Sequence, residues 1–164
     1  MGSIQSLLAI AALFLLSLLS VRFNSSVLEN MSVEVENKVY LTAFSLGDDL
    51  IEEIKQKAFD NETVVFRSIN PEELTPRNLF GPDAGENFVT DFNDIDDYHG
   101  YSRPVSLPHA EGYLVICNVD YVNSNNHDLV SLAQTFYKRI EVTVSSNYMR
   151  MPVKLSFVFT LHSK

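Results

Sequence analysis

The chain has 164 residues, a formal net charge of −9 and a single cysteine. This length allows one domain plus a segment outside its core, and an acidic chain without clustered Lys and Arg excludes a nucleic-acid partner. Cys117 cannot form an internal disulfide or a cysteine-rich metal site. Its apolar neighbours predict a buried, unreactive thiol.

Residues 1–22 form the first predicted element, an apolar helix. No charged residue lies between Ile4 and Val21, and a helical run of this length matches the hydrocarbon core of a bilayer. A cleaved signal peptide would begin with basic residues, and a helix buried in a soluble core would need a larger protein around it. We therefore predict a retained, single-pass membrane helix. Its apolar surface consists of Ile4, Leu7, Leu8, Ile10, Leu13, Phe14, Leu15, Leu18 and Val21.

Residues 23–60 are predicted to continue as an amphipathic helix, because the segment has one glycine and no proline. The poor helix formers at 24–26 predict a looser turn just after the apolar run. The apolar stripe that follows is broad and drifts around the helix, which indicates contacts on more than one side. A short extended segment at 33–39 is the alternative. The amphipathic stretch 48–57 predicts that the helix ends near Asp60.

The rest of the chain carries strand and loop signals. A short β-branched run at 63–67 predicts one strand, and residues 70–108 hold five prolines and predict a long irregular loop. Longer strands are predicted at 112–122, 138–145 and 153–162, with turns at 123–128 and 145–152. The predicted fold class is α+β, a long N-terminal helix packed on an antiparallel sheet of about four strands. The domains are the helix 1–22 and a globular domain 23–164 whose sheet spans 112–162.

Three stretches, Asp49–Asp60, Asp94–Tyr101 and Tyr137–Val144, resemble the type IV pilin and pseudopilin superfamily, most closely minor pilins of the mannose-sensitive haemagglutinin type and PilV-like subunits. The order of elements along the whole chain is similar as well. The resemblance implies a non-catalytic structural subunit of a type IV pilus-like or type II secretion pseudopilus-like filament. Its apolar helix would lie in the inner membrane and then in the filament core, and the domain would be extracytoplasmic. The implied partners are copies of itself, other pilin-like subunits and the assembly machinery.

One position departs from the family pattern. Pilins carry a glutamate at the fifth mature position that pairs with the terminal amine of a neighbour. Gln5 stands there if Met1 is the first mature residue, and Leu7 if processing follows Gly2. Neither supplies the charge, so hydrophobic helix packing is the available route to assembly. The alternative function is a membrane-anchored accessory protein whose domain binds a partner in an envelope complex.

An acidic cluster near the middle of the chain is the best candidate for a ligand site. Closely spaced oxygen ligands suit a hard cation, so calcium is a possible cofactor, although the spacing does not match an EF-hand. The alternative is a loop ordered by its own Asx-turns and by aromatic packing. No nucleophile elbow, phosphate loop or H-E-x-x-H motif occurs, so we expect no enzyme and no other cofactor. The candidate ligands are Asp91, Asp94, Asp96 and Asp97, with His99 beside them.

Overall fold

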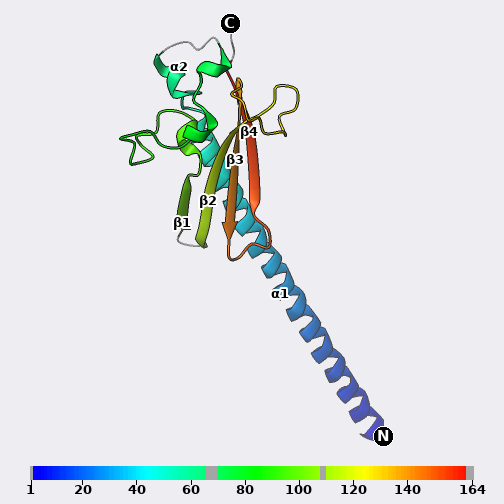
Figure 1. Cartoon of the computed structure of the whole chain (residues 1–164). Helices are drawn as coiled ribbons and strands as arrows, with labels where there is room; N and C mark the ends of the chain where they lie inside the picture. The colour runs from blue at the N-terminus through cyan, green and yellow to red at the C-terminus, as the bar shows by residue number, and fades with distance from the viewer. Residues whose placement is uncertain (1, 66–69, 108–109, 162–164) are drawn as a thin grey trace. The chain divides into compact units, whose positions relative to one another are not determined.

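The computed structural model describes residues 2–65, 70–107 and 110–161 (Figure 1). The chain divides into two compact units, Met1–Lys38 and Val39–Lys164. Each unit is described by itself. The α+β fold predicted from the sequence is confirmed, with a long N-terminal helix and a four-stranded antiparallel sheet.

Helix α1 spans Gly2–Ile54 without interruption. The loosening expected at 24–26 and the alternative of an extended segment at 33–39 are both wrong. The Ser25 hydroxyl donates to the carbonyl of Val21 at 3.0 Å, which lets a poor helix former remain within the helix. The helix ends at Ile54 rather than near residue 60, because Ala58 leaves it to pair with the loop at Asn93 and Asp94.

The sheet has the order β1-β2-β3-β4, with every neighbouring pair antiparallel (Figure 1). Strands β2, β3 and β4 match the three longer strands of the sequence prediction. Strand β1 lies inside the segment predicted as loop and contains Pro104, which an edge strand tolerates because its outer side needs no N–H donor. The bounds are β1 Ser102–Leu107, β2 Ala110–Tyr121, β3 Tyr137–Ser146 and β4 Val153–Thr160.

The short strand predicted at 63–67 is wrong. Residues Asn61–Val65 form helix α2, and residues 66 and 67 lie outside the described part of the chain. Asp60 starts this helix, because its carboxylate accepts the amide N–H of Glu62 at 3.2 Å and its carbonyl accepts the Thr63 hydroxyl at 2.6 Å. Local capping of this kind overrides the β propensity of the run.

The segment predicted as loop at 70–108 is organised by short turns up to the start of β1. Three 3₁₀ helices occur in it, η1 Pro71–Glu73, η2 Arg77–Leu79 and η3 Asp96–Tyr98. The predicted turn at 123–128 is part of a longer connection, since β2 ends at Tyr121 and β3 begins at Tyr137. The second predicted turn is confirmed between Ser146 and Val153.

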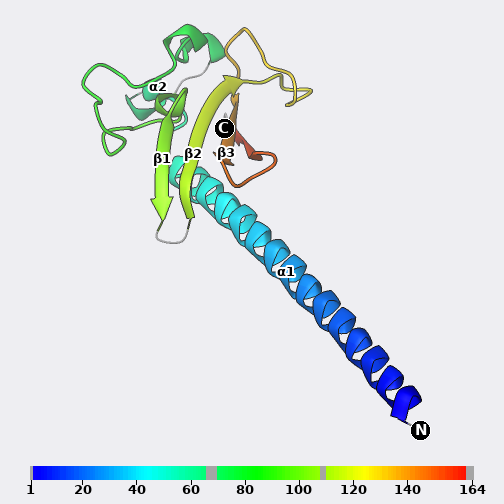
Figure 2. The same cartoon turned by 90° about the horizontal axis from the view of Figure 1, so that it is seen from below.

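The core of the Val39–Lys164 unit lies between the end of α1 and one face of the sheet (Figure 2). On α1 the buried face includes Ala43, Gly47 and Leu50, at the spacing of helical turns. A Cβ built on Gly47 would lie 2.8 Å from Leu155 Cδ1, so glycine permits the close approach of helix and sheet. Cys117 is fully buried in this core, as predicted.

Candidate functional site

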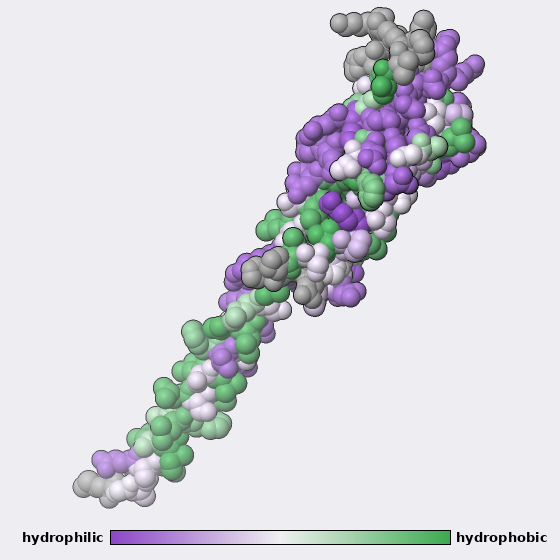
Figure 3. All heavy atoms as spheres, turned by 90° about the vertical axis from the view of Figure 1, so that its left-hand side faces the viewer, coloured by the Kyte–Doolittle hydropathy of each residue, from purple (hydrophilic) through white to green (hydrophobic). Residues whose placement is uncertain are grey.

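The first candidate surface is the apolar part of α1 in the Met1–Lys38 unit. The structure leaves all nine apolar residues predicted from Ile4 to Val21 between 47% and 70% exposed. Figure 3 shows apolar side chains on the face of this segment that is turned to the viewer. Within the described residues, α1 is long and apolar enough to cross a membrane.

Exposure of this surface to water is unfavourable. The free energy of each large apolar side chain falls by about 1.5–3 kcal/mol when the side chain is transferred completely out of water. Patches of this size on soluble proteins mark a surface that contacts a partner or a membrane. The segment is thus compatible with a position in a membrane.

The second candidate is a buried ion centre in the Val39–Lys164 unit. Lys138 projects from β3 and is fully buried, as is Asp60, which follows α1. The Lys138 ammonium donates to Asp60 Oδ2 at 2.7 Å and to the Phe59 carbonyl at 2.8 Å. Its third partner is Asp96 Oδ1, from the start of η3.

Aromatic rings enclose the ammonium. Its nitrogen lies 4.6 Å from the ring centroid of Phe59, and 5.2 Å from those of Phe80 and Tyr121. The π faces stabilise a cation, and the apolar rings keep water away from Lys138. Electrostatic interactions inside such an enclosure are much stronger than at the surface.

Asp60 is the most extensively hydrogen-bonded carboxylate of this centre. The Thr75 amide N–H and hydroxyl both donate to it, at 3.1 Å and 2.9 Å, and the Tyr121 hydroxyl lies 3.3 Å from Oδ2. With Lys138 and the Glu62 amide, these donors come from four separate parts of the sequence. Such donors stabilise the ionised form of a carboxylate.

The acidic loop contributes turn-forming carboxylates. Asp94 Oδ1 accepts the amide N–H groups of Asp96 and Asp97, and Asp97 Oδ2 accepts those of Asn93 and Asp94. The bond from the Asp96 amide to Asp94 is an Asx-type turn, which the sequence offered as the alternative to a metal, and Asp97 closes the loop from the other side. Asp91 is exposed and bonds within its own turn, to Phe88 and Thr90.

The structure therefore brings together only part of the predicted ligand set. Carboxylate oxygens of Asp60, Asp94 and Asp96 lie within 4.8 Å of one another, and the ammonium of Lys138 bonds to two of these three groups. An internal cation thus occupies the place among these carboxylates that a metal ion would take. Calcium binding stays a prediction.

Burial disturbs the acid–base behaviour of the loop. It raises the pKa of Asp96 to about 8, against the opposing charge of Lys138. Burial likewise raises the pKa of Asp97 to about 7, with the charges of Asp94 and Glu86 adding to the effect. Asp96 Oδ2 is also buried, and no group in the described part of the chain donates a hydrogen bond to it. Asp96 is therefore protonated over much of the neutral range.

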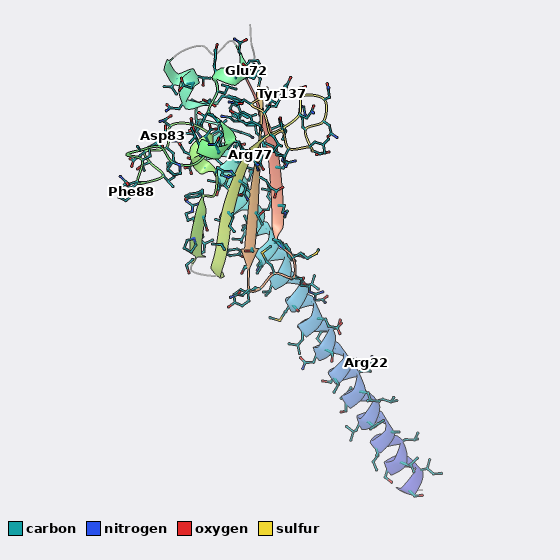
Figure 4. All side chains as sticks on the ribbon, viewed as in Figure 1. Arg22, Glu72, Arg77, Asp83, Phe88 and Tyr137 are labelled. Atoms are coloured by element: carbon teal, nitrogen blue, oxygen red, sulfur yellow. The ribbon has the colours of Figure 1, made fainter. Side chains whose placement is uncertain are left out.

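A pocket of about 390 Å³ opens beside the ion centre. Asp96 lines it together with residues from α2, from the segment after residue 70 and from the acidic loop. Glu72 and Asp83, labelled in Figure 4, are among them. Seven carboxylate side chains line this pocket: Glu62, Glu72, Glu73, Asp83, Asp94, Asp96 and Asp97.

Sequence reasoning missed Lys138 and Asp60. The alternation of β3 contains a signal for the first, because Lys138 is in phase with Ile140 and Val142 on the buried face. A lysine at an inward position of a strand requires a buried anion. The identity of that anion depends on the chain path after α1, which no local pattern encodes.

Comparison of the chain with protein-family models, with curated proteins and with solved structures finds no significant match.

Proposed function

We propose that this chain is a non-catalytic structural subunit of a type IV pilus-like or type II secretion pseudopilus-like filament. The observation that carries the proposal is the exposed apolar surface from Ile4 to Val21 at the start of α1. A bundle of similar helices from other subunits would cover this surface. The α+β fold of the chain is compatible with that role.

The same surface serves both stages of the proposed assembly. Residues 1–22 first hold the subunit in the inner membrane, with residues 23–164 on the extracytoplasmic side. Lipid tails and the core of a helix bundle are both apolar, so transfer of the helix between them changes its free energy little. An assembly machinery can therefore move subunits between membrane and filament, while the sheet and the 70–108 segment form the outer surface.

A second candidate function is a membrane-anchored accessory protein that never polymerises. The membrane-length helix α1 is compatible with it, since such a helix can anchor a domain that never polymerises. The domain would then bind a partner within an envelope complex.

Leu15→Asp in the native cell tests the proposal, with Leu132→Asp as the matched control. Leu15 lies within the apolar run, whereas Leu132 is 88% exposed in the β2–β3 connection. A charge within the apolar run costs about 2.5–3.5 kcal/mol in a membrane. We expect Leu15→Asp to abolish filaments in the sheared surface fraction, as seen by electron microscopy and mass spectrometry, and Leu132→Asp to retain them.

The two candidate functions differ in what the variant loses. Protease resistance of the domain establishes that the Leu15→Asp chain is still folded. Normal filaments together with a lost envelope complex would support the accessory protein. If the Leu15→Asp chain enters filaments as efficiently as the wild-type chain does, the proposal is refuted.

A further inference from the structure

The ion centre places an amine and two carboxyl groups in contact inside the domain. Lys138 and Asp60 are fully buried, and the Asp96 side chain is 4% exposed. A lysine amine is a good nucleophile only when it is neutral, and burial favours the neutral form of both an amine and a carboxyl group. The rings of Phe59, Phe80 and Tyr121 keep water away from Lys138, so a carboxyl group in contact with it must accept its proton.

The two carboxyl groups differ in their surroundings. Asp60 accepts hydrogen bonds from Thr75, Tyr121 and the Glu62 amide, which hold its carboxylate in place against Lys138. Asp96 has one oxygen against Lys138 and a second, Oδ2, that is buried without any hydrogen-bond partner. An amine attacks the carbonyl carbon of a carboxyl group, and the unpartnered Oδ2 of Asp96 is the oxygen placed to leave.

We propose that Lys138 and Asp96 become joined by an amide bond between Nζ of the lysine and Cγ of the aspartic acid, with Asp60 as the proton acceptor. The assignment is independent of the proposed filament function. It rests on the contact of Lys138 with both carboxyl groups, on the burial of all three side chains and on the unpartnered Oδ2 of Asp96.

The reaction balances without an added reagent. Asp60 Oδ2 takes a proton from the Lys138 ammonium across 2.7 Å, which gives a neutral amine. The amine attacks Cγ of Asp96, the Nζ–Cγ bond forms and the Cγ–Oδ2 bond breaks. Oδ2 leaves as water, taking its own proton and one further proton from the nitrogen. The products are a secondary amide, one water molecule and protonated Asp60.

Geometry and solvent access both favour the product. Well-oriented groups within one molecule react with effective concentrations of roughly 10⁵–10⁸ M. The amide removes a buried ion pair and the unpartnered Oδ2 together, and both are unfavourable in a protein interior. Asp96 lines the 390 Å³ pocket, which gives the released water a way out. The bond would tie β3 to η3 across 42 positions of sequence.

The test is the intact mass of the full chain, purified in detergent and kept folded at neutral pH for several days. We expect a mass below the sequence value by one water, about 18 Da. A cyclic imide at an aspartate gives the same loss, so the chain is also digested. Trypsin leaves both residues in one peptide, because Arg103 precedes Pro104, so chymotrypsin is used to cut between them. A chymotryptic peptide that contains Lys138 joined to one that contains Asp96 is the expected product. Trypsin should then fail to cleave after Lys138.

Variants separate the roles. Lys138→Met should restore the full mass, whereas Lys154→Met, an exposed lysine on β4, should keep the deficit. Asp60→Asn should slow formation at least tenfold (about 1.4 kcal/mol in the barrier) while near-UV circular dichroism stays native. Full mass and normal cleavage after Lys138 in folded wild-type chain would overturn the proposal, even if the variants fail to fold. A Lys138–Asp60 link would overturn the assigned roles.

Discussion

Because α1 and β4 approach each other closely at Gly47, we expect Gly47→Ala to stabilise the domain less than a glycine-to-alanine change in a helix usually does. Gly47→Ala should gain about 1 kcal/mol from helix propensity. The new Cβ would lie 2.8 Å from Leu155 Cδ1, against an optimum of about 3.5–4.0 Å, so Leu155 must move by roughly 1 Å. A leucine forced off its rotamer costs about 0.5–1.5 kcal/mol. We therefore expect Gly47→Ala alone to change the free energy of unfolding by less than about 1 kcal/mol.

When the Leu155 side chain is shortened, the stabilisation that Gly47→Ala gains from helix propensity should become measurable. In a Leu155→Ala background, Gly47→Ala should stabilise the domain by about 1 kcal/mol, which makes the coupling between the two sites about 0.5–1.5 kcal/mol. Leu129→Ala, at an exposed loop leucine, is the matched background and should leave the effect of Gly47→Ala as it is in the wild type.

Urea unfolding of the full chain in detergent micelles measures these values. Tyrosine fluorescence can follow the domain, since the chain has seven tyrosines and no tryptophan. The same stabilisation in the wild-type and Leu155→Ala backgrounds would refute the reasoning, because it would show that helix and sheet do not meet closely at Gly47.

The thermal midpoint should fall as the pH rises from about 5 to about 8, because Asp97, with its pKa raised to about 7, holds a proton in the folded chain that the unfolded chain has already released. Asp97→Asn should make this slope shallower at constant ionic strength and leave the part due to Asp96, whose pKa is raised to about 8, and an unchanged slope would contradict the assignment. Burial raises the pKa of the Cys117 thiol to about 12, so a thiol reagent at pH 8 should modify it only in urea; native reaction at the rate of a free thiol would contradict its burial. Calcium should leave the thermal midpoint within about 1 °C of its original value, because Lys138 already pairs with two of the clustered carboxylates. A rise of several degrees that Asp94→Asn abolishes and Asp91→Asn does not would establish a calcium site instead.

The elements that the sequence predicted well are those with a long, regular pattern. The apolar run at 4–21 and the period-two alternation of β3 each repeat one signal over many residues. The errors fall on short segments, where one tertiary or capping contact decides. Helix α2 replaces a predicted strand because Asp60 caps it, and β1 forms within a proline-rich segment because β2 offers it a pairing edge.

The candidate site divides in the same way. The apolar surface is made by residues close together in the sequence, so its nine side chains could be named from the sequence, and all nine are exposed in the structure. The ion centre joins the end of α1, the acidic loop and β3, and Asp60 and Lys138 are 78 positions apart. Proximity in sequence suggested Asp91 as a member of the acidic set, and its exposed turn excludes it from the buried cluster.

Hydrophobicity and its period act locally along the chain, so consecutive residues are enough to specify a long apolar helix ahead of an acidic α+β domain. The position of Lys138 among the carboxyl groups of Asp60 and Asp96 is seen only in the folded chain. A buried charge requires partners in space, and the path of the chain chooses which ones it meets.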